Sequence, residues 1–425
     1  MAKAQGIRGV IMVAGGGTRL LPVTEDISKC MMPVAGKPIM QYSLECMDAL
    51  GVPEVCIVVR PSFRRQIESY FGDRFGNCRL TYVEQDMSKK GTAAAVSAAA
   101  HFIGSGPALV MAGDILAECG DVAALVDAHF AGDADTTMLL KEVKDPQRFG
   151  VAELRDGRVV DIVEKPESPK SNLINASVYV VGPKFMDEIG EVRLSPRGEY
   201  EITTALYVLA AMGKLGGHVA HGYWNDIGTP WGLLDANEHF MKAMKGDIRG
   251  KVENCTLKGE VVVEEGAEVF NSYIEGPCYI ARGAKVGPFA QVRKHSYIGP
   301  ACEIGGFTVV KNSILMEGVK AKHLSYIGDS IIGHHTNFGS STQVANLRFD
   351  RRTVRMRICG QEYDSGRVKM GCVVGPNVNF GSNSTVLPGK TVGGGSIVGS
   401  GVIVSDDVPP KTRIICKQQL ERTEV

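Results

Sequence analysis

The chain has 425 residues, of which 44% are apolar, with 47 basic side chains against 47 acidic ones. This length allows two or more domains, and the balanced charge gives no overall field that would attract a nucleic acid or a membrane surface. No run of about 18 apolar residues occurs and the start, Met1–Arg8, has no signal-peptide core, so we expect a cytoplasmic protein. The 11 cysteines form no C-x-x-C pair, which favours reduced thiols over disulfides or a zinc site.

The first 240 or so residues alternate short apolar strands with helical stretches such as Thr92–His101 and Val122–Phe130. The expected strands are Val10–Val13, Val55–Val59, Leu80–Val83, Ala108–Met111 and Thr136–Leu140. This alternation is typical of an α/β, Rossmann-like domain with a mainly parallel sheet. Ligands in such sheets bind beyond the carboxyl ends of the strands.

Three consecutive glycines, Gly15–Gly17, follow the first strand. Without Cβ atoms their backbone N–H groups can turn toward a ligand, and Arg19 and Lys29 add positive charge nearby in the sequence. The combination suits a nucleoside triphosphate. The alternative is an ordinary βα turn with surface charges.

The whole string from Met12 to Pro38 resembles the sugar-1-phosphate nucleotidylyltransferases, with G-x-G-T-R, Pro-x-Thr, a lysine and P-V-x-G-K-P in order. No G-K-[ST] closes the loop, so it is not a Walker A motif. The resemblance implies that Arg19 and Lys29 are catalytic and stabilise the triphosphate and the leaving pyrophosphate. It also implies a nucleotide-binding turn made of Ala14, Gly15, Gly16, Gly17 and Thr18.

Two aspartates match the family's metal-binding positions. Asp114 stands in Met-Ala-Gly-Asp after a strand, and Asp226 in Trp-Asn-Asp-Ile-Gly-Thr-Pro. Either residue alone would more often serve a turn or a helix cap. As a pair in the family's order they are expected to bind Mg²⁺, which prefers one or two carboxylates plus phosphate oxygens.

Further motifs of this resemblance concern the base and the sugar. Gln85, Gly91 and Thr92 match positions that bind the pyrimidine, although the gap between Gln85 and Gly91 is one residue longer than in the commonest bacterial form. The sugar-phosphate positions, in F-G-V, V-E-K-P and N-A-x motifs, are Gly150, Glu164, Lys165 and Asn175. Ser177 stands where the last motif usually has glycine.

After Gly250 aliphatic residues recur at every sixth position, in three blocks of consistent spacing. The positions are Ile274, Ile280, Val286, Val292, Ile298, Ile304 and Val310, then Ile332, Phe338 and Val344, then Val374, Phe380, Val386, Val392, Val398 and Val404. A six-residue period predicts a hexapeptide β-helix rather than a glycine-rich β-sandwich. The family that shows such repeats implies left-handed coiling and a homotrimer of packed prisms.

We therefore expect a nucleotidylyltransferase domain at 1–242, a linker at 243–252, an all-β left-handed β-helix at 253–410 and a tail at 411–425. Between Val344 and Val374 the hexads stop, and this excursion is basic. It is either a solvated loop or a clamp for phosphates, with Arg352 and Arg355 as candidates for substrate or coenzyme A phosphates.

The string Lys320-Ala-Lys-His-Leu-Ser-Tyr-Ile-Gly-Asp resembles the acetyltransferase half of the bifunctional, archaeal-type enzymes that make UDP-N-acetylglucosamine. Acetylating an amine requires a base, and histidine titrates in the right range. The resemblance makes His323 that base. It assigns acetyltransferase substrate binding to Arg293, Lys311, Tyr326, Asn337 and Asn346.

The leading hypothesis is a bifunctional enzyme that acetylates glucosamine-1-phosphate with acetyl-CoA as co-substrate and then transfers uridylyl from UTP. The sequence leaves UTP or dTTP, and the identity of the hexosamine-1-phosphate, open. One alternative is a glucose-1-phosphate thymidylyltransferase or uridylyltransferase whose β-helix only serves oligomerisation. Another is a non-catalytic regulatory or translation-factor subunit, which would not need Arg19, Lys29, Asp114 and Asp226.

Overall fold

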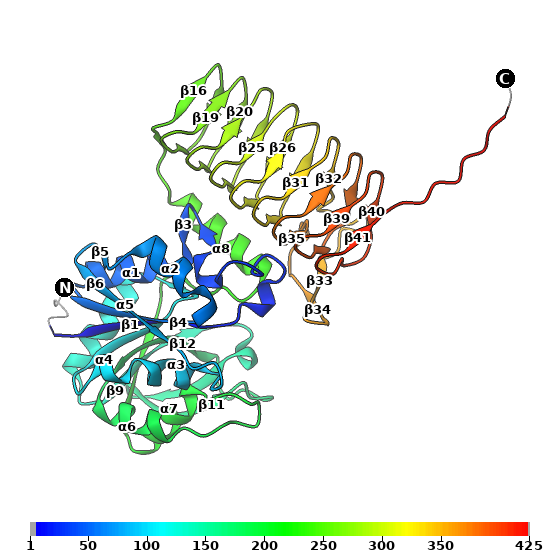
Figure 1. Ribbon diagram of the computed structural model, residues 1–425. Coiled ribbons are helices and arrows are strands. Elements are labelled where there is room, and N and C mark those ends of the chain that lie inside the picture. Colours follow the sequence, from blue (N-terminus) through cyan, green and yellow to red (C-terminus); the bar gives the residue numbers. More distant parts are fainter. Residues whose placement is uncertain (1–5, 424–425) are drawn as a thin grey trace. The chain divides into compact units, whose positions relative to one another are not determined.

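A computed structural model describes residues 6–423 (Figure 1). Residues 1–5, within the start expected to lack a signal-peptide core, and residues 424–425 of the expected tail lie outside the described residues. The chain forms two compact units. The first comprises the described part of Met1–Gly16 with Ser28–Met32 and Pro38–Ile227; the second comprises Gly17–Ile27, Pro33–Lys37 and the described part of Gly228–Val425. The domain boundaries drawn from the sequence remain predictions.

The first unit is built on a ten-stranded mixed sheet. In spatial order its strands are β10 (Gly150–Arg155), β11 (Arg158–Glu164), β13 (Leu215–Ala220), β9 (Thr136–Glu142), β12 (Leu173–Val181), β7 (Ala108–Ala112), β1 (Arg8–Val13), β4 (Glu54–Val59), β6 (Cys78–Glu84) and β5 (Arg74–Phe75). The run β7, β1, β4 and β6 is parallel, as expected, while β12 pairs antiparallel with both β7 and β9. All five strands expected from the sequence are present.

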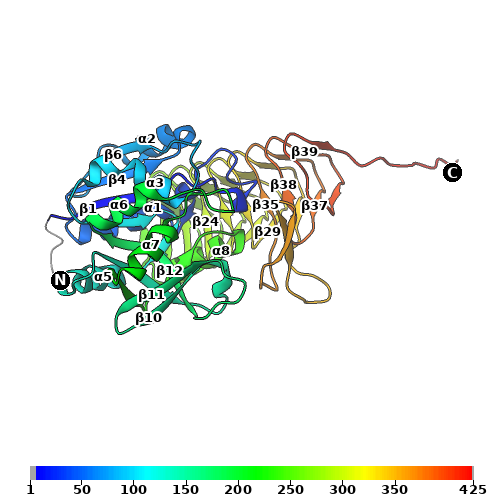
Figure 2. The same cartoon turned by 90° about the horizontal axis from the view of Figure 1, so that it is seen from below.

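Helices cover both faces of this sheet, which makes the α/β layering that the alternating pattern predicted (Figures 1 and 2). Alternate β1 residues separate the faces: Val10 and Met12 belong to the core cluster that also contains residues of α3, α6 and α7, whereas Gly9 lies against Met47 of α1. The helices are α1 (Ile39–Ala49), α2 (Arg64–Phe71), α3 (Thr92–Ala98), α4 (Ala100–Ile103), α5 (Cys119–Ala131), α6 (Pro183–Glu191) and α7 (Ile202–Ala211). A two-stranded sheet joins β8 (Ile115–Ala117) to β14 (Trp224–Asp226).

The second unit contains a β-helix with three parallel sheets, one for each face of the prism. The first face has β15 (Asp247–Ile248), β18 (Val261–Val263), β21 (Cys278–Ile280), β24 (Ser296–Ile298), β27 (Ile314–Leu315), β30 (Ile331–Ile332), β35 (Val373–Val374) and β38 (Thr391–Val392). The second face has β16 (Lys251–Glu253), β19 (Glu268–Phe270), β22 (Lys285–Val286), β25 (Glu303–Ile304), β28 (Lys320–Ala321), β31 (Asn337–Phe338), β36 (Asn379–Phe380), β39 (Ile397–Val398) and β41 (Arg413–Ile414). The third face has β17 (Thr256–Lys258), β20 (Tyr273–Glu275), β23 (Gln291–Arg293), β26 (Val309–Lys311), β29 (Tyr326–Gly328), β32 (Gln343–Val344), β37 (Thr385–Val386) and β40 (Ile403–Val404).

The hexad residues make the core of this β-helix. All sixteen positions found from the six-residue period are buried in one continuous cluster. Small residues between them, such as Cys278, Ala284 and Cys302, are buried too and let the coils close tightly. The period is six because each hexad forms one side of a coil and turns one aliphatic side chain inward.

The interruption after Val344 is an antiparallel hairpin of β33 (Arg355–Ile358) and β34 (Gln361–Asp364), which projects from the coils (Figure 1). The chain then rejoins the stack, where β35 pairs with β30 and β37 pairs with β32. The second unit also includes α8 (Pro230–Lys242) and the short strand β2 (Pro33–Val34). Of the short strand β3 (Lys37–Pro38), Lys37 belongs to the second unit and Pro38 to the first. None of the helices in the described part of the chain combines the length and apolarity of a membrane span.

The cysteines correct one expectation. Cys46 of α1 and Cys119 of α5 form a disulfide, because both helices pack on the same face of the sheet and bring residues 73 apart in sequence to a Cα–Cα distance of 5.3 Å. No spacing rule could reveal that pairing. Free cysteines such as Cys56 and Cys302 are buried, and burial raises the pKa of the Cys302 thiol to about 12, so it behaves as a small apolar group.

Candidate active sites

Asp114 stands just beyond β7, beside the end of β1. Gly113 donates its N–H to the Met12 carbonyl oxygen at 2.9 Å, and a Cβ at Gly113 would collide with the Val13 side chain. Glycine therefore allows the turn after β7 to pass close to β1. The result places the Asp114 carboxylate at the carboxyl end of the parallel strands, where the sequence predicted it.

Asp226 reaches the same place from a distant part of the chain. It ends β14 opposite Ile115 of β8, and the Ile227 N–H donates to the Asp114 carbonyl oxygen at 3.1 Å. Lys29 lies between the two carboxylates: its Nζ is 2.5 Å from Asp114 Oδ2 and 3.7 Å from Asp226 Oδ1. The Lys29 side chain is only 12% exposed. Three residues predicted from separate motifs thus form one charged cluster in the first unit.

The chemistry of this cluster fits a magnesium ion. Two carboxylates converge, and the described residues hold no group of three or more His, Cys, Asp or Glu side chains that could bind a metal. Zinc sites usually take three or four protein ligands, whereas Mg²⁺ takes one or two carboxylates and completes its shell with phosphate oxygens and water.

Gln85 organises the loop between β6 and α3. Its side chain is 5% exposed, and Nε2 donates to the carbonyl oxygens of Lys89 at 2.8 Å and Gly91 at 3.5 Å. The loop is tied to the segment before α7, since the Tyr200 N–H donates to the Lys90 carbonyl oxygen at 2.8 Å. Gly91 has a φ of +120°, and a Cβ there would collide with the Tyr200 backbone. The glycine of the G-T motif is thus required by the backbone geometry at the start of α3.

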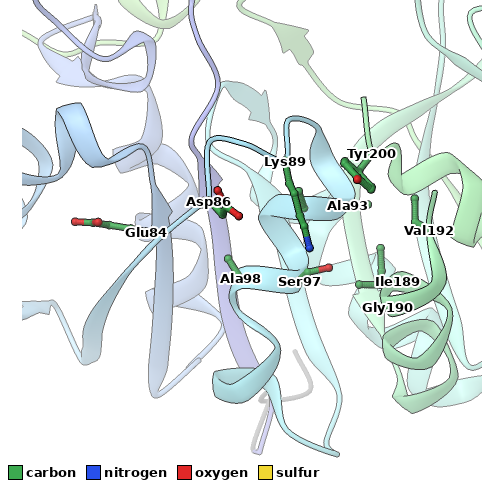
Figure 3. A pocket seen from close by; sticks show the side chains of 11 residues that line it. Glu84, Asp86, Lys89, Ala93, Ser97, Ala98, Ile189, Gly190, Val192 and Tyr200 are labelled. Atoms are coloured by element: carbon green, nitrogen blue, oxygen red, sulfur yellow. The ribbon is translucent and has the colours of Figure 1, made fainter. Parts of the chain in front are cut away.

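A cavity of about 320 Å³ adjoins this loop and is lined by residues that the motifs did not single out. Its walls come from the loop, from α3 and from the end of α6 (Figure 3). The Lys89 and Ser97 side chains point toward one another in it, whereas Glu84 points away. The motif residues Gln85, Gly91 and Thr92 are not among its lining residues.

The predicted sugar positions also come together. Gly150 and Glu164 face each other across the β10–β11 pair, and a Cβ at Gly150 would lie 3.0 Å from Glu164 Oε2 and 3.5 Å from Asn175 Cβ. Asn175 Oδ1 accepts hydrogen bonds from the Ser177 N–H at 3.0 Å and the Tyr179 hydroxyl at 2.9 Å. Lys165 lies at the rim, half exposed, with Nζ 3.9 Å from Glu164 Oε1.

The backbone conformation at Ser177 explains why the family usually has glycine at this position. It has a φ of +59° where β12 bulges between Asn175 and Tyr179. Glycine adopts this left-handed conformation freely, whereas serine does so at a cost. Within the bulge, the carbonyl oxygen of the buried Ala176 accepts a hydrogen bond from Trp224 Nε1 at 3.0 Å. Trp224 therefore couples the strand of Asp226 to the sugar positions.

The glycine turn divides between the two units. Ala14, Gly15 and Gly16 belong to the first, and Gly17, Thr18 and Arg19 to the second. Within the second unit the Arg19 guanidinium lies against the backbone of Gly228, two residues after Asp226 in the sequence. The Thr24 hydroxyl donates to the Gly17 carbonyl oxygen at 2.9 Å and holds the turn closed.

Most of the predicted acetyltransferase residues share the third face of the β-helix. Arg293 pairs with Lys311 on adjacent coils, and Tyr326 starts the next strand of the same face. Asn346 follows β32 and donates from Nδ2 to the Tyr326 hydroxyl at 3.1 Å. Glu275 Oε2 is 3.5 Å from Arg293 Nε and holds it on the face. Residues 53 apart in sequence therefore meet because successive coils stack.

His323 and Asn337 lie differently. Asn337 is on β31 of the second face, not on the face of Tyr326. His323 is exposed at the corner between β28 of the second face and β29 of the third, and its carbonyl oxygen accepts hydrogen bonds from the Ser341 N–H and the Ser325 hydroxyl. The exposed side chain of Leu324 adjoins it, and Phe289 and Phe307 stack at 5.4 Å on earlier coils of the same corner.

The nucleotidyl transferase family model matches residues 8–243, and the model of the GMPPB C-terminal domain matches residues 274–363. The bifunctional protein GlmU of Methanocaldococcus jannaschii is 39% identical over 97% of this chain and 98% of that protein. The chain belongs to the bifunctional GlmU family. A bifunctional sugar-1-phosphate nucleotidylyltransferase/acetyltransferase of Sulfurisphaera tokodaii is 33% identical over 95% of this chain and 98% of that protein. A crystal structure of UDP-glucose pyrophosphorylase with UDP-glucose, 26% identical, aligns with 56% of this chain and 99% of that one at a TM-score of 0.52.

The structure also adds residues that the GlmU-family motifs did not indicate. Arg197 NH2 lies 3.3 Å from Glu164 Oε1 and 2.8 Å from Glu201 Oε1, so it orients the predicted sugar carboxylate. In the β-helix, Asp329 and Arg367 lie beneath Asn346. No periodic pattern marks these residues, because each acts through a contact made only in the folded chain.

Proposed function

We propose that the first unit transfers a uridylyl group from UTP to N-acetylglucosamine-1-phosphate and releases pyrophosphate. The observation that carries this proposal is the cluster of Lys29 with Asp114 and Asp226, assembled at the carboxyl end of the sheet. In the reaction a sugar phosphate oxygen attacks the α-phosphorus of UTP. A new P–O bond forms as the bond to the β-phosphate breaks, and the electron pair leaves with pyrophosphate.

Positive charge is the main requirement of that step. Mg²⁺ held by Asp114 and Asp226 would neutralise phosphate charge. The Lys29 ammonium lies against both carboxylates and is placed to stabilise the charge that develops on the phosphates. The sequence motif assigns the glycine turn and Arg19 to the same triphosphate.

The orientation of the Gln85 side chain supports binding of a pyrimidine base. Its Nε2 donates to loop carbonyl oxygens, which leaves Oε1 as the atom that can accept a hydrogen bond from a ligand. Uracil and thymine both carry an imide N–H that would satisfy this acceptor. The same geometry thus fits UTP and dTTP, and their 5-position distinguishes them.

The sugar positions suit the hydroxyls and the phosphate of a sugar phosphate. Glu164 is held by Arg197 and faces Gly150, so its carboxylate is fixed for sugar hydroxyls. Asn175 is fixed by the Ser177 and Tyr179 hydrogen bonds, and Lys165 at the rim suits the sugar's phosphate.

For the second unit we propose acetyl transfer from acetyl-CoA to glucosamine-1-phosphate. His323 takes the proton of the attacking amine, the nitrogen forms a bond to the thioester carbonyl carbon, and the C–S bond breaks to release coenzyme A thiol. Arg293 and Lys311, stacked on the third face, provide the charge that a sugar phosphate requires.

We further propose a cytoplasmic homotrimer that packs through the β-helix. The exposed side chains of Phe289, Phe307 and Leu324 form an apolar column at the corner that bears His323, as a subunit contact beside an acetyl site requires. Sedimentation tests this directly. A single species of monomer mass would contradict the trimer.

A substrate matrix tests both activities. UTP and dTTP are each combined with acetylated, amino and plain hexose-1-phosphates, with and without acetyl-CoA, and pyrophosphate and thiol release are measured. We expect pyrophosphate release with UTP and the acetylated sugar, and thiol release with the amino sugar. Pyrophosphate release from dTTP and glucose-1-phosphate, without thiol release, would instead support the thymidylyltransferase with a scaffolding β-helix.

A further inference from the structure

A buried carboxylate, Asp329, lies beneath the predicted acetyl-acceptor residues of the third face. It follows β29 directly and is 3% exposed. Two side-chain amides donate to it: Asn312 Nδ2 to Oδ1 at 2.7 Å and Asn346 Nδ2 to Oδ2 at 2.5 Å. Arg367 NH2 lies 3.6 Å from Oδ1. A buried charge is costly unless it is paired and hydrogen-bonded, and this one is both.

The basic excursion supplies the arginine. Arg367 stands near the end of the excursion, just before the chain rejoins the coils, and its side chain is 16% exposed. Its NH1 is paired with Asp235 of α8 as well, so one guanidinium joins α8 to the buried carboxylate. The Met370 N–H donates to the Asn346 carbonyl oxygen and the Gly371 N–H to the Asp329 carbonyl oxygen, which closes the excursion over both residues.

The network determines which way the Asn346 amide faces. An ionised carboxylate only accepts hydrogen bonds, so Asn346 must present its NH₂ group to Asp329. The same Nδ2 donates to the Tyr326 hydroxyl at 3.1 Å, which occupies both amide hydrogens. The remaining atom, Asn346 Oδ1, is an acceptor. It is the complement of an N–H donor such as the amine of a hexosamine phosphate.

We propose that Asp329, held by Arg367, is a positioning residue that orients Asn346 and, through it, Tyr326 for recognition of the acceptor amine. This inference rests on the acetyl transfer proposed above. It also gives the excursion a role, because the excursion places Arg367 next to Asp329. It also explains Gly328, since a Cβ there would lie 2.6 Å from both Asn346 Nδ2 and the Tyr326 hydroxyl oxygen.

Two variants test the proposal. In Asp329→Asn the side chain can donate as well as accept, so the Asn346 amide is free to turn and present NH₂ to the amine. We expect KM for glucosamine-1-phosphate to rise about tenfold or more, with KM for acetyl-CoA nearly unchanged. Asp329→Glu, which remains an acceptor, should recover part of the loss. Gly328→Ala displaces only the far ends of two side chains, so it should raise the same KM while the thermal midpoint stays near that of the unchanged protein.

Asp350→Asn is the matched control, because Asp350 lies on the same excursion, is 41% exposed and pairs there with the Arg348 side chain and the Arg352 N–H. It should leave both KM values unchanged. Uridylyl transfer, measured in every variant, reports the integrity of the first unit. An unchanged KM for the amino sugar in both Asp329→Asn and Gly328→Ala, or an equal rise for the two substrates, would overturn the positioning role. If the unchanged protein itself releases no thiol with glucosamine-1-phosphate, the proposed acetyl transfer fails instead.

Discussion

The two predicted sites are assembled in opposite ways. In the first unit Asp114 and Asp226 come from segments 112 positions apart and meet because β8 and β14 pair beyond the end of the sheet. In the β-helix, Arg293 and Lys311 meet because they are 18 positions apart, one coil of the stack. The first site therefore depends on topology and the second on a repeating register. Changes at one site should leave the other working, which makes each activity the internal control for the other.

The largest effect is expected from the carboxylate cluster. Asp114→Asn should lower uridylyl transfer by about 10³-fold or more, since metal-ion stabilisation contributes several kcal/mol. Thiol release should remain unchanged because Asp114 belongs to the first unit. Parallel assays of pyrophosphate and thiol check this, and a loss of both activities would show that the two sites are not independent.

His323→Ala is the reciprocal experiment. Removing a general base should lower thiol release from acetyl-CoA by about 10²–10³-fold, with uridylyl transfer from UTP retained. His335→Ala is the control, because His335 lies at the corner between β30 of the first face and β31 of the second, away from the corner between β28 and β29 that bears His323. Equal activity of His323→Ala and the unchanged protein would remove His323 from the mechanism.

The repeating register can be tested through stability. Ile304→Ala removes a side chain that is 1% exposed in the β-helix core and should lower the free energy of unfolding by about 2–5 kcal/mol. Ile397→Ala, at an outward-facing position that is 46% exposed, should cost far less. Chemical denaturation compares the two. Similar losses would contradict the assignment of the hexad residues to the core.

The smallest effect concerns Ser177. Ser177→Gly should change the free energy of unfolding by less than about 1 kcal/mol, because relief of left-handed strain is offset by the greater chain entropy of glycine. Ser177→Val should lower it by about 1–3 kcal/mol, because a β-branched residue is poorly tolerated at a φ of +59°. Thermal unfolding of the two variants measures the difference, and an undamaged Val variant would show that the bulge can relax.

Patterns within one segment were readable from the sequence. Every residue that the six-residue period named lies in the β-helix core, because each coil repeats the same geometry. The alternation of strands and helices likewise predicted the α/β unit. The resemblance of three motifs to a known family pointed to Lys29, Asp114 and Asp226, which the fold brings together.

Other features were decided only by the tertiary structure. The Cys46–Cys119 disulfide arises from two helices that share a face of the sheet. The burial of Asp329 beneath Arg367 arises from an excursion that leaves the repeat and returns, and the left-handed Ser177 from a bulge in β12. Each of these three features depends on which segments, distant in sequence, lie side by side in the fold. The sequence shows periodic patterns and motifs, but it does not show which distant segments come into contact.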